Sequence, residues 1–254
     1  VVVWAGRDHR YKSNNVGTVA ASVSTYASIE IFNPDLVISA GTAGGFGALG
    51  ASVGDVYVST KCVFHARRIP EAHRGGSLEE YGFGHFRSPP LSGLVAAVPG
   101  LKQGIVSTGD SLDCSPTDQD LLRAEGACVK EMEAAACAWV CQNACVPFFA
   151  LKSITDVVDG PRPTAQEFYS NLSHASETLQ VQLGAMLEQL AKHPLTHWGM
   201  QAVSPPSERA GSGLRLLPPS NHRRTMGRGP GLLVPVCVGL VLGVLVGTAL
   251  QRDK

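Results

Sequence analysis

The sequence has no excess of charge of either sign and no cysteine pattern typical of a structural metal site. Lysine plus arginine and aspartate plus glutamate both total 21 residues. This balance does not suggest broad electrostatic attraction to nucleic acid, so no nucleic-acid partner is expected. The seven cysteines lack CxxC pairing, and their odd number does not indicate a disulfide framework. We expect them to be small buried apolar residues in a reducing compartment.

A glycine-rich stretch matches the dinucleotide fingerprint GxGxxG but lacks the context that the fingerprint needs. The string "GFGALG" at residues 45–50 is followed by the strand-like "ASVGDVYVST" and does not open a helix. Dinucleotide binding is therefore not favoured. Gly41, Gly44 and Gly45 lack Cβ atoms and would let a ligand approach the main chain closely. Thr42 adds a hydroxyl at the same place.

Strand patterns alternate with helix patterns along most of the chain. We expect strands at 36–40, 55–60, 146–155 and 104–113, the last ending in a polar turn. We expect helices at 17–32, 118–127 and 132–144, and a longer one from Thr164, with capping-box spacing to Glu167, to about His193. This alternation predicts a largely parallel sheet that is covered by helices on both faces.

The composition changes after residue 192. We expect a disordered linker over 193–230, because it is rich in Pro, Gly, Ser and Arg. Residues 231–250 contain no charge and have the length of a membrane-spanning helix, with residues 251–254 as a tail. The alternative for 231–250 is a buried core strand or helix. Basic residues are more numerous before the run than after it, which predicts a cytosolic globular domain on a C-terminal anchor.

Four polar clusters occupy comparable places in this pattern. "GTAGG" at 41–45, "TGDSLD" at 108–113 and "TDVVDG" at 155–160 each follow an expected strand, and "EME" at 131–133 precedes an expected helix. Ligands of open parallel sheets bind at the carboxyl ends of strands. We therefore expect the four clusters to surround one pocket.

These clusters carry a resemblance to a known family. "SAGTAGG", "STGDSLD", "EMEAAA" and "SITDVVDGPRPTAQEF" resemble, in order and spacing, the 5′-methylthioadenosine/S-adenosylhomocysteine nucleosidases of the nucleoside phosphorylase superfamily. The match covers residues 1–192 and is most similar to the plant-type enzymes. It implies an α/β, three-layer nucleoside phosphorylase-like fold with a mixed, mostly parallel sheet. The expected C-terminal transmembrane helix would be added to that fold.

The resemblance assigns the EME motif to the sugar. It implies that Glu133 grips the ribose hydroxyls, that Met132 packs beneath the sugar, and that Glu131 contributes mainly its backbone. The alternative for Glu133 is an acid at a helix N-terminus that interacts only with the helix dipole.

The resemblance assigns Asp156 as the acid that protonates adenine N7. An ordinary aspartate has a pKa near 3.9 and can donate at neutral pH only if its surroundings raise that value. The alternative for Asp156 is a residue that caps a turn. A further set of residues is implied to contact the ligand or flank the acid: Thr42, Ala43, Gly44, Leu112, Asp113, Lys152, Thr155, and Val16 near the catalytic water.

The chain departs from the family pattern in three places. The water-activating glutamate follows a first strand that would precede Val1, so we expect an N-terminally incomplete product. Ala66 stands where the plant-type pattern has aspartate, which leaves the preference near the 5′ end of the sugar open. Ser39 stands where hexameric phosphorylases carry a phosphate-binding arginine, which favours water as the nucleophile.

The sequence thus predicts an N-glycosidic hydrolase that releases adenine from methylthioadenosine in methionine salvage, with S-adenosylhomocysteine as a second candidate substrate. The resemblance implies a homodimer with no metal and no organic cofactor. Two alternatives stay open: a purine nucleoside phosphorylase, and a catalytically inactive, membrane-tethered module that binds nucleosides.

Overall fold

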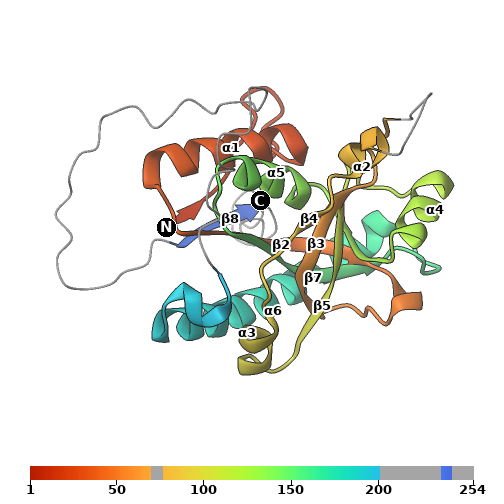
Figure 1. Ribbon diagram of the computed structural model, residues 1–254. Helices are drawn as coiled ribbons and strands as arrows, with labels where there is room; N and C mark the ends of the chain where they lie inside the picture. Colours follow the sequence, from red (N-terminus) through yellow and green to blue (C-terminus); the bar gives the residue numbers. More distant parts are fainter. Residues whose placement is uncertain (70–76, 201–235, 242–254) are drawn as a thin grey trace, which may run out of the picture.

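The computed structural model describes residues 1–69, 77–200 and 236–241 (Figure 1). Its centre is a closed ring of five strands, in which β2 pairs with β6 and β7, β5 pairs with β3 and β6, and β3 pairs with β7. The five strands are β2 (Leu36–Gly45), β3 (Val56–Phe64), β5 (Leu101–Thr108), β6 (Ala127–Glu131) and β7 (Phe148–Val157). The shorter strands β1 (Val2–Val3), β4 (Phe86–Arg87) and β8 (Val236–Val241) extend this sheet.

The sheet is mixed and mostly parallel, as the sequence predicted. The pairs β2·β7, β3·β5, β5·β6, β2·β8 and β1·β8 are parallel. The pairs β2·β6, β3·β7 and β3·β4 are antiparallel, so β5 and β6 run opposite to β2 and β7. The two sets of strands meet at β3·β7 and again where Gly44 of β2 pairs with Lys130 of β6.

Helices cover both faces of the sheet (Figure 1). The helices α1 (Gly17–Phe32) and α5 (Ala134–Asn143) pack on one face, and α3 (Ser92–Ala97) and α6 (Thr164–Lys192) pack on the other. Two further helices contact single strands: α2 (Ser77–Phe83) contacts β3, and α4 (Pro116–Ala124) contacts β6. This arrangement confirms the expected α/β architecture.

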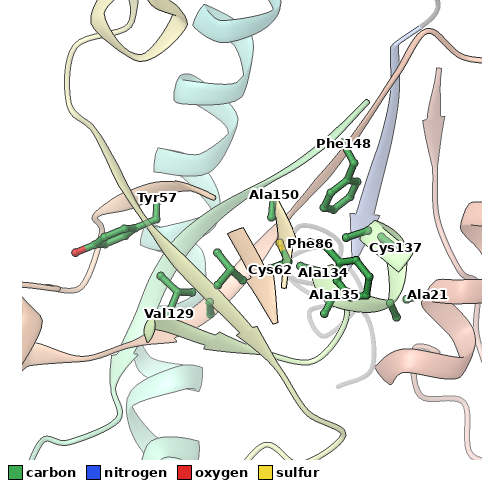
Figure 2. Packing of buried hydrophobic residues seen from close by; sticks show 14 of the residues in the cluster. Ala21, Tyr57, Cys62, Phe86, Val129, Ala134, Ala135, Cys137, Phe148 and Ala150 are labelled. Atoms are coloured by element: carbon green, nitrogen blue, oxygen red, sulfur yellow. The ribbon is translucent and has the colours of Figure 1, made fainter. Parts of the chain in front are cut away.

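The core beneath α1 and α5 is built largely from small side chains. Ala134, Ala135 and Cys137 of α5 are buried against Ala21 of α1 and the aromatic ring of Phe148 (Figure 2). Small residues let the helix backbone approach the sheet closely, at a packing density typical of protein interiors. The expected burial of the cysteines in this helix is confirmed for Cys137 and Cys141.

The opposite core extends further along the chain than the sequence predicted. Phe149, Leu179 and Met186 are fully buried between β7 and α6. A short 3₁₀ helix, Leu195–Trp198, follows α6, and Trp198 and Met200 are buried in the same cluster. The expected start of a disordered linker at 193 is therefore wrong, because apolar side chains hold this segment on the core. Residues 201–230 of that linker lie outside the described residues.

Three local expectations were also wrong. The strand β2 continues through Gly45, so "GTAGG" forms the end of this strand and does not follow it. The strand β6 occupies 127–131, where no strand was expected. Glu167 does not close a capping box on Thr164, because Pro163 is the N-cap and the Glu167 carboxylate accepts a hydrogen bond from Val157 N instead, at 2.9 Å.

The uncharged run at 231–250 is described only in part. Residues 236–241 form β8, which lies parallel to β2 from Leu36 to Gly41. Over these six residues the structure has a strand and not the expected helix. The remainder of the run, and the tail at 251–254, lie outside the described residues. Among the helices of the described ranges, none combines the length and the apolar character needed to cross a bilayer.

Candidate active site

The structure brings the four polar clusters together, although not for the reason expected. They meet because the end of β2 lies between β7 and β6, where Gly44 pairs with Asp156 on one side and with Lys130 on the other. Thr108, at the end of β5, pairs with Glu131, at the end of β6. The ends of four strands therefore lie around one place, even though two of them run opposite to the other two.

Glu131 is the structural centre of this place. Its buried carboxylate accepts hydrogen bonds from Glu133 N at 3.0 Å and Ala134 N at 2.9 Å, and also from the Thr108 hydroxyl. The Lys152 ammonium lies 2.8 Å from Glu131 Oε2. Burial opposes ionisation, but the Lys152 charge and these donors outweigh it and hold the pKa of Glu131 below its usual value. The side chain, and not only the backbone, of Glu131 therefore shapes the site.

Lys152 is likewise fully buried, and its role differs from simply flanking the acid. Burial alone would lower the pKa of its ammonium, but Glu131 and Glu133 outweigh burial and raise it. Both partners of this ion pair are thus charged. The pair ties β7 to the turn that starts α5, so it fixes the position of Glu133.

Glu133 lies at the N-cap position of α5 but does not cap that helix with its side chain. Its Oε1 accepts a hydrogen bond from Gly17 N at the start of α1, at 2.9 Å. Burial and the neighbouring Glu131 carboxylate raise the pKa of Glu133 to about 7. The alternative of an acid that serves only its own helix dipole does not fit this contact. Met132, between the two glutamates, is half-buried.

The start of α1 is fixed by a residue that sequence reasoning missed. Asp110 Oδ1 accepts a hydrogen bond from Thr18 N at 2.6 Å, and its Oδ2 accepts one from the Thr18 hydroxyl at 2.7 Å. This carboxylate is 92 positions away from its partner in the sequence, so no local capping pattern indicates it. Asp110 thereby links the loop after β5 to the helix that contacts Glu133.

Asp156 has the surroundings of a carboxylic acid that keeps its proton. It is 2% exposed, and its Oδ1 accepts a hydrogen bond from the Thr155 hydroxyl at 2.7 Å. Its Oδ2 is buried and has no hydrogen-bond partner among the described residues. Burial raises the pKa of Asp156, with a smaller contribution from Glu167. An aspartate that only caps a turn would have backbone N–H partners, and no such bond is found for Asp156 in the described ranges.

The glycine of β2 makes room for this acid. A Cβ on Gly44 would lie 2.8 Å from Asp156 Oδ2, closer than real Cβ contacts. The adjacent Ala43 is buried, and its carbonyl accepts a hydrogen bond from the Thr155 hydroxyl at 3.1 Å. The half-buried Thr42 precedes it on the same strand. At Gly44 the absence of a Cβ makes room for the Asp156 side chain, whereas the expected approach of a ligand to this main chain stays a prediction.

The segment expected to line adenine is accessible. Leu112 is 45% exposed and Asp113 is also exposed. A second residue that sequence reasoning missed, Lys130, supports this segment from below, since its Nζ donates to the carbonyls of Ser111 at 2.6 Å and Leu112 at 3.2 Å. Lys130 directly precedes the EME motif. Because no strand was expected there, the side of the chain on which its side chain lies could not be predicted.

A cavity of about 600 Å³ adjoins the site at the start of α1. Val16, expected near the catalytic water, is the N-cap of α1 and lines this cavity. Trp4, Val19 and Val23 are among the other lining residues, and all three are exposed. The two acids of the site are not in its lining. The cavity is thus an apolar hollow beside the acid cluster.

The fold and this cluster of acids define a class of protein. The sequence profile of the Phosphorylase superfamily matches residues 1–188, and the chain belongs to that superfamily.

Within it, the plant-type resemblance seen in the motifs is confirmed. The chain is 44% identical over 187 residues to a 5′-methylthioadenosine/S-adenosylhomocysteine nucleosidase of Arabidopsis thaliana, covering 74% of this chain and 72% of that protein. A solved structure of an Arabidopsis thaliana 5′-methylthioadenosine nucleosidase without ligand superposes with a TM-score of 0.72 at 40% identity, covering 75% of this chain and 76% of that one. A nucleosidase of Colwellia psychrerythraea, solved with adenine, gives a TM-score of 0.56 at 28% identity, over 70% and 79% of the two chains.

Proposed function

We propose that this protein hydrolyses the N-glycosidic bond of 5′-methylthioadenosine, with S-adenosylhomocysteine as a second substrate, and releases adenine. The observation that carries the proposal is the state of Asp156. It is a buried carboxyl with a raised pKa and one unpaired oxygen, at a strand end where Gly44 leaves space. Its nucleosidase relatives, described above, supply the reaction and the substrate class.

In this proposal each residue acts on a different part of the substrate or on the attacking water. Departure of adenine from C1′ leaves an oxocarbenium-like sugar and needs a proton on the base, which Asp156 gives to N7. Glu133 accepts hydrogen bonds from the ribose hydroxyls, above Met132. Leu112 and Asp113 border the adenine, and Val16 borders the attacking water. The resemblance assigns activation of that water to a glutamate that would precede Val1.

Water is favoured over phosphate as the nucleophile by the character of β2. Ser39 is completely buried, and its hydroxyl has no hydrogen-bond partner among the described residues. A neutral buried hydroxyl cannot replace the bidentate, charge-assisted contact of an arginine with phosphate. Adenine release that required added phosphate would show instead that the protein is a phosphorylase.

The test is release of adenine from methylthioadenosine, followed by chromatography, for a product that carries the water-activating glutamate, with Asp156 intact and as Asp156→Asn. Asparagine has a similar shape but no proton of suitable acidity, so we expect binding to persist and turnover to fall about 10²–10⁴-fold. Asp159→Asn is the matched control, because Asp159 is bonded to Gly47 N and Ala48 N instead. Near-normal turnover of Asp156→Asn would contradict the proposed role. Binding without turnover by that product with Asp156 intact would favour a nucleoside-binding module.

We further propose that the protein is a homodimer. The resemblance implies this state, and the exposed apolar side chains of α1, namely Val19, Val23 and Ile31, support it as a surface that gains from being covered. Light scattering during size-exclusion chromatography measures the mass directly. A monomer at micromolar concentration would contradict it.

Anchoring of the chain in a membrane through 231–250, with the enzyme domain in the cytosol, also stays a proposal. Its support is the length and lack of charge of the run, and the excess of basic residues before it. A membrane span and the strand β8 cannot form from the same residues at once. Extraction of membranes with alkaline carbonate, comparing the full chain with a version ending at residue 230, decides between them.

A further inference from the structure

Lys130 is a buried charge that the proposed chemistry does not use. The residue is only 5% exposed, and its two hydrogen bonds go to the neutral carbonyls of Ser111 and Leu112. None of the ion pairs found among the described residues includes Lys130. Buried charges without a close opposite partner are rare in proteins and costly. A purpose other than stability is therefore indicated.

The position of Lys130 in the sheet relates it to the acid. Lys130 on β6 pairs with Gly44 on β2, and Gly44 pairs with Asp156 on β7. Neighbouring strands lie about 4.8 Å apart, so the two backbones are about 10 Å apart. The residue between them is a glycine, and a Cβ there would meet Asp156 Oδ2 at 2.8 Å and Val158 Cγ2 at 2.6 Å. The two groups interact electrostatically, and each affects the ionisation of the other.

Other charged groups face this pair. Asp156 is also influenced by Glu167 of α6, which makes ionisation harder, and by the Thr155 hydroxyl, which makes it easier. Lys130 is also influenced by Cys114, Asp118 and Asp113. Among the groups that influence Asp156, Lys130 is the cation.

We propose that Lys130 is a positioning residue that holds the Ser111–Leu112 turn beneath the purine and stabilises the carboxylate that Asp156 becomes on giving up its proton. The inference rests on the proposed function. In the step concerned, the Asp156 proton moves to adenine N7 and the C1′–N9 electron pair leaves with adenine. The oxygen of water then bonds to C1′, the water-activating base takes the proton that water loses, and exchange with solvent removes that proton from the base and returns one to Asp156. The negative charge thus exists on Asp156 only between the loss and the return of its proton.

The two roles separate in two substitutions. Lys130→Met keeps an unbranched side chain that is one heavy atom shorter, and removes both hydrogen bonds and the charge. Lys130→Arg keeps the charge and can still donate to the carbonyls. Lys102→Met is the control, because Lys102 lies on the surface and pairs with Asp55. Thermal denaturation of each variant shows first that it is folded.

Binding of adenine, measured by titration calorimetry at pH 7, tests the holding of the turn. Loss of two charge-assisted hydrogen bonds beneath the purine should weaken adenine binding about tenfold in Lys130→Met. We expect a smaller change in Lys130→Arg and none in Lys102→Met. Equal adenine affinity of the wild type and Lys130→Met would overturn this role.

Titration of the Asp156 carboxyl carbon by ¹³C NMR, assigned with Asp156→Asn, tests the electrostatic role without requiring turnover. Removing the positive charge should move the Asp156 pKa upward in Lys130→Met and leave it close to the wild-type value in Lys130→Arg. An unchanged titration in Lys130→Met would refute the interaction. If the wild type bound no adenine, the proposed function and the purine role would fail together, whereas the NMR titration would still support or overturn the effect of the charge on Asp156.

Discussion

Removal of the Lys152 ammonium tests whether the EME turn is held by a buried ion pair. The side chains of Lys152 and Glu131 are 0% and 1% exposed, and their charged atoms are 2.8 Å apart. Lys152→Met fills nearly the same volume but leaves the Glu131 carboxylate without its cation. Breaking a buried pair on one side costs about 3–5 kcal/mol.

That loss is large relative to the stability of a domain, which is about 5–15 kcal/mol. For a domain of this size each kcal/mol corresponds to roughly 2–4 °C in Tm. We therefore expect the Tm of Lys152→Met to fall by about 10 °C at pH 7. Adding Glu131→Gln removes the unpaired charge while a carbonyl oxygen remains for the backbone N–H donors. The double variant should recover most of the lost stability.

The effect also has a defined pH dependence. In the wild type the folded pKa of Glu131 lies below its ordinary value of 4.5, so its stabilisation is present above that pH and is lost on acidification. In Lys152→Met burial acts unopposed by the cation and raises the folded pKa of Glu131. The protonated form is then favoured, so the deficit should be largest at neutral pH and should shrink as the pH falls toward 4.5.

Urea denaturation of the four members of this double-mutant cycle, at pH 5 and pH 7.5, measures these quantities. The coupling between the two sites should be at least about 1 kcal/mol, beyond the range found for independent positions. Two results would refute the reasoning: a Lys152→Met variant within about 0.5 kcal/mol of the wild type, or a deficit that grows on acidification.

Three other substitutions test other parts of the site, and a fourth, on α6, is a control. Gly44→Ala places a methyl group against the Asp156 oxygen and should lower the turnover rate at least about tenfold. Gly184→Ala, which has open space on α6, should instead stabilise the protein by about 0.8 kcal/mol, measured by urea denaturation. Glu133 has a folded pKa near 7, raised by burial and by its acidic neighbour, so its ionisation destabilises the fold as the pH rises from 4.5 through 7. Glu133→Gln should therefore raise Tm above pH 7 while increasing KM for methylthioadenosine, and a lower Tm at pH 8 would contradict this. Asp110→Ala removes the cap of α1 and should cost about 1 kcal/mol in urea denaturation, with no loss expected if the cap is unimportant.

The elements that were predictable from the sequence are those whose pattern is long or strongly apolar. The helix at 17–32 and the strand at 146–155 agree closely with α1 and β7. The strand β6 was missed because its five residues, "ACVKE", place two charges in a run too short to show alternation. Those charges, Lys130 and Glu131, belong to the site, and they disrupt the apolar pattern that would otherwise have indicated a strand.

The gathering of the four clusters was predictable, but their geometry was not. Motif order placed Glu133, Asp156 and the glycine-rich strand in one site. The antiparallel crossing of β2 and β6, which positions Lys130 beside Gly44, depends on the tertiary fold. The bond between Asp110 and Thr18 joins residues 92 positions apart, and no local rule indicates such a pair. Composition and periodicity indicate which residues are buried. The partner that a buried charged group contacts depends on how the elements pack in the tertiary fold.

The difference between the two glutamates of the EME motif follows from one cation. Lys152 is close enough to form an ion pair with Glu131, which also receives the N–H groups of the α5 turn, and that carboxylate is ionised. Its negative charge and the burial of Glu133 then raise the pKa of the second carboxyl to about 7. Two identical side chains, two positions apart, thereby acquire different roles, as pairs of carboxylates do when their surroundings separate their pKa values. The first acid holds the turn, and the second, bonded through Oε1 to Gly17 N, is the one whose ionisation can respond to a ligand.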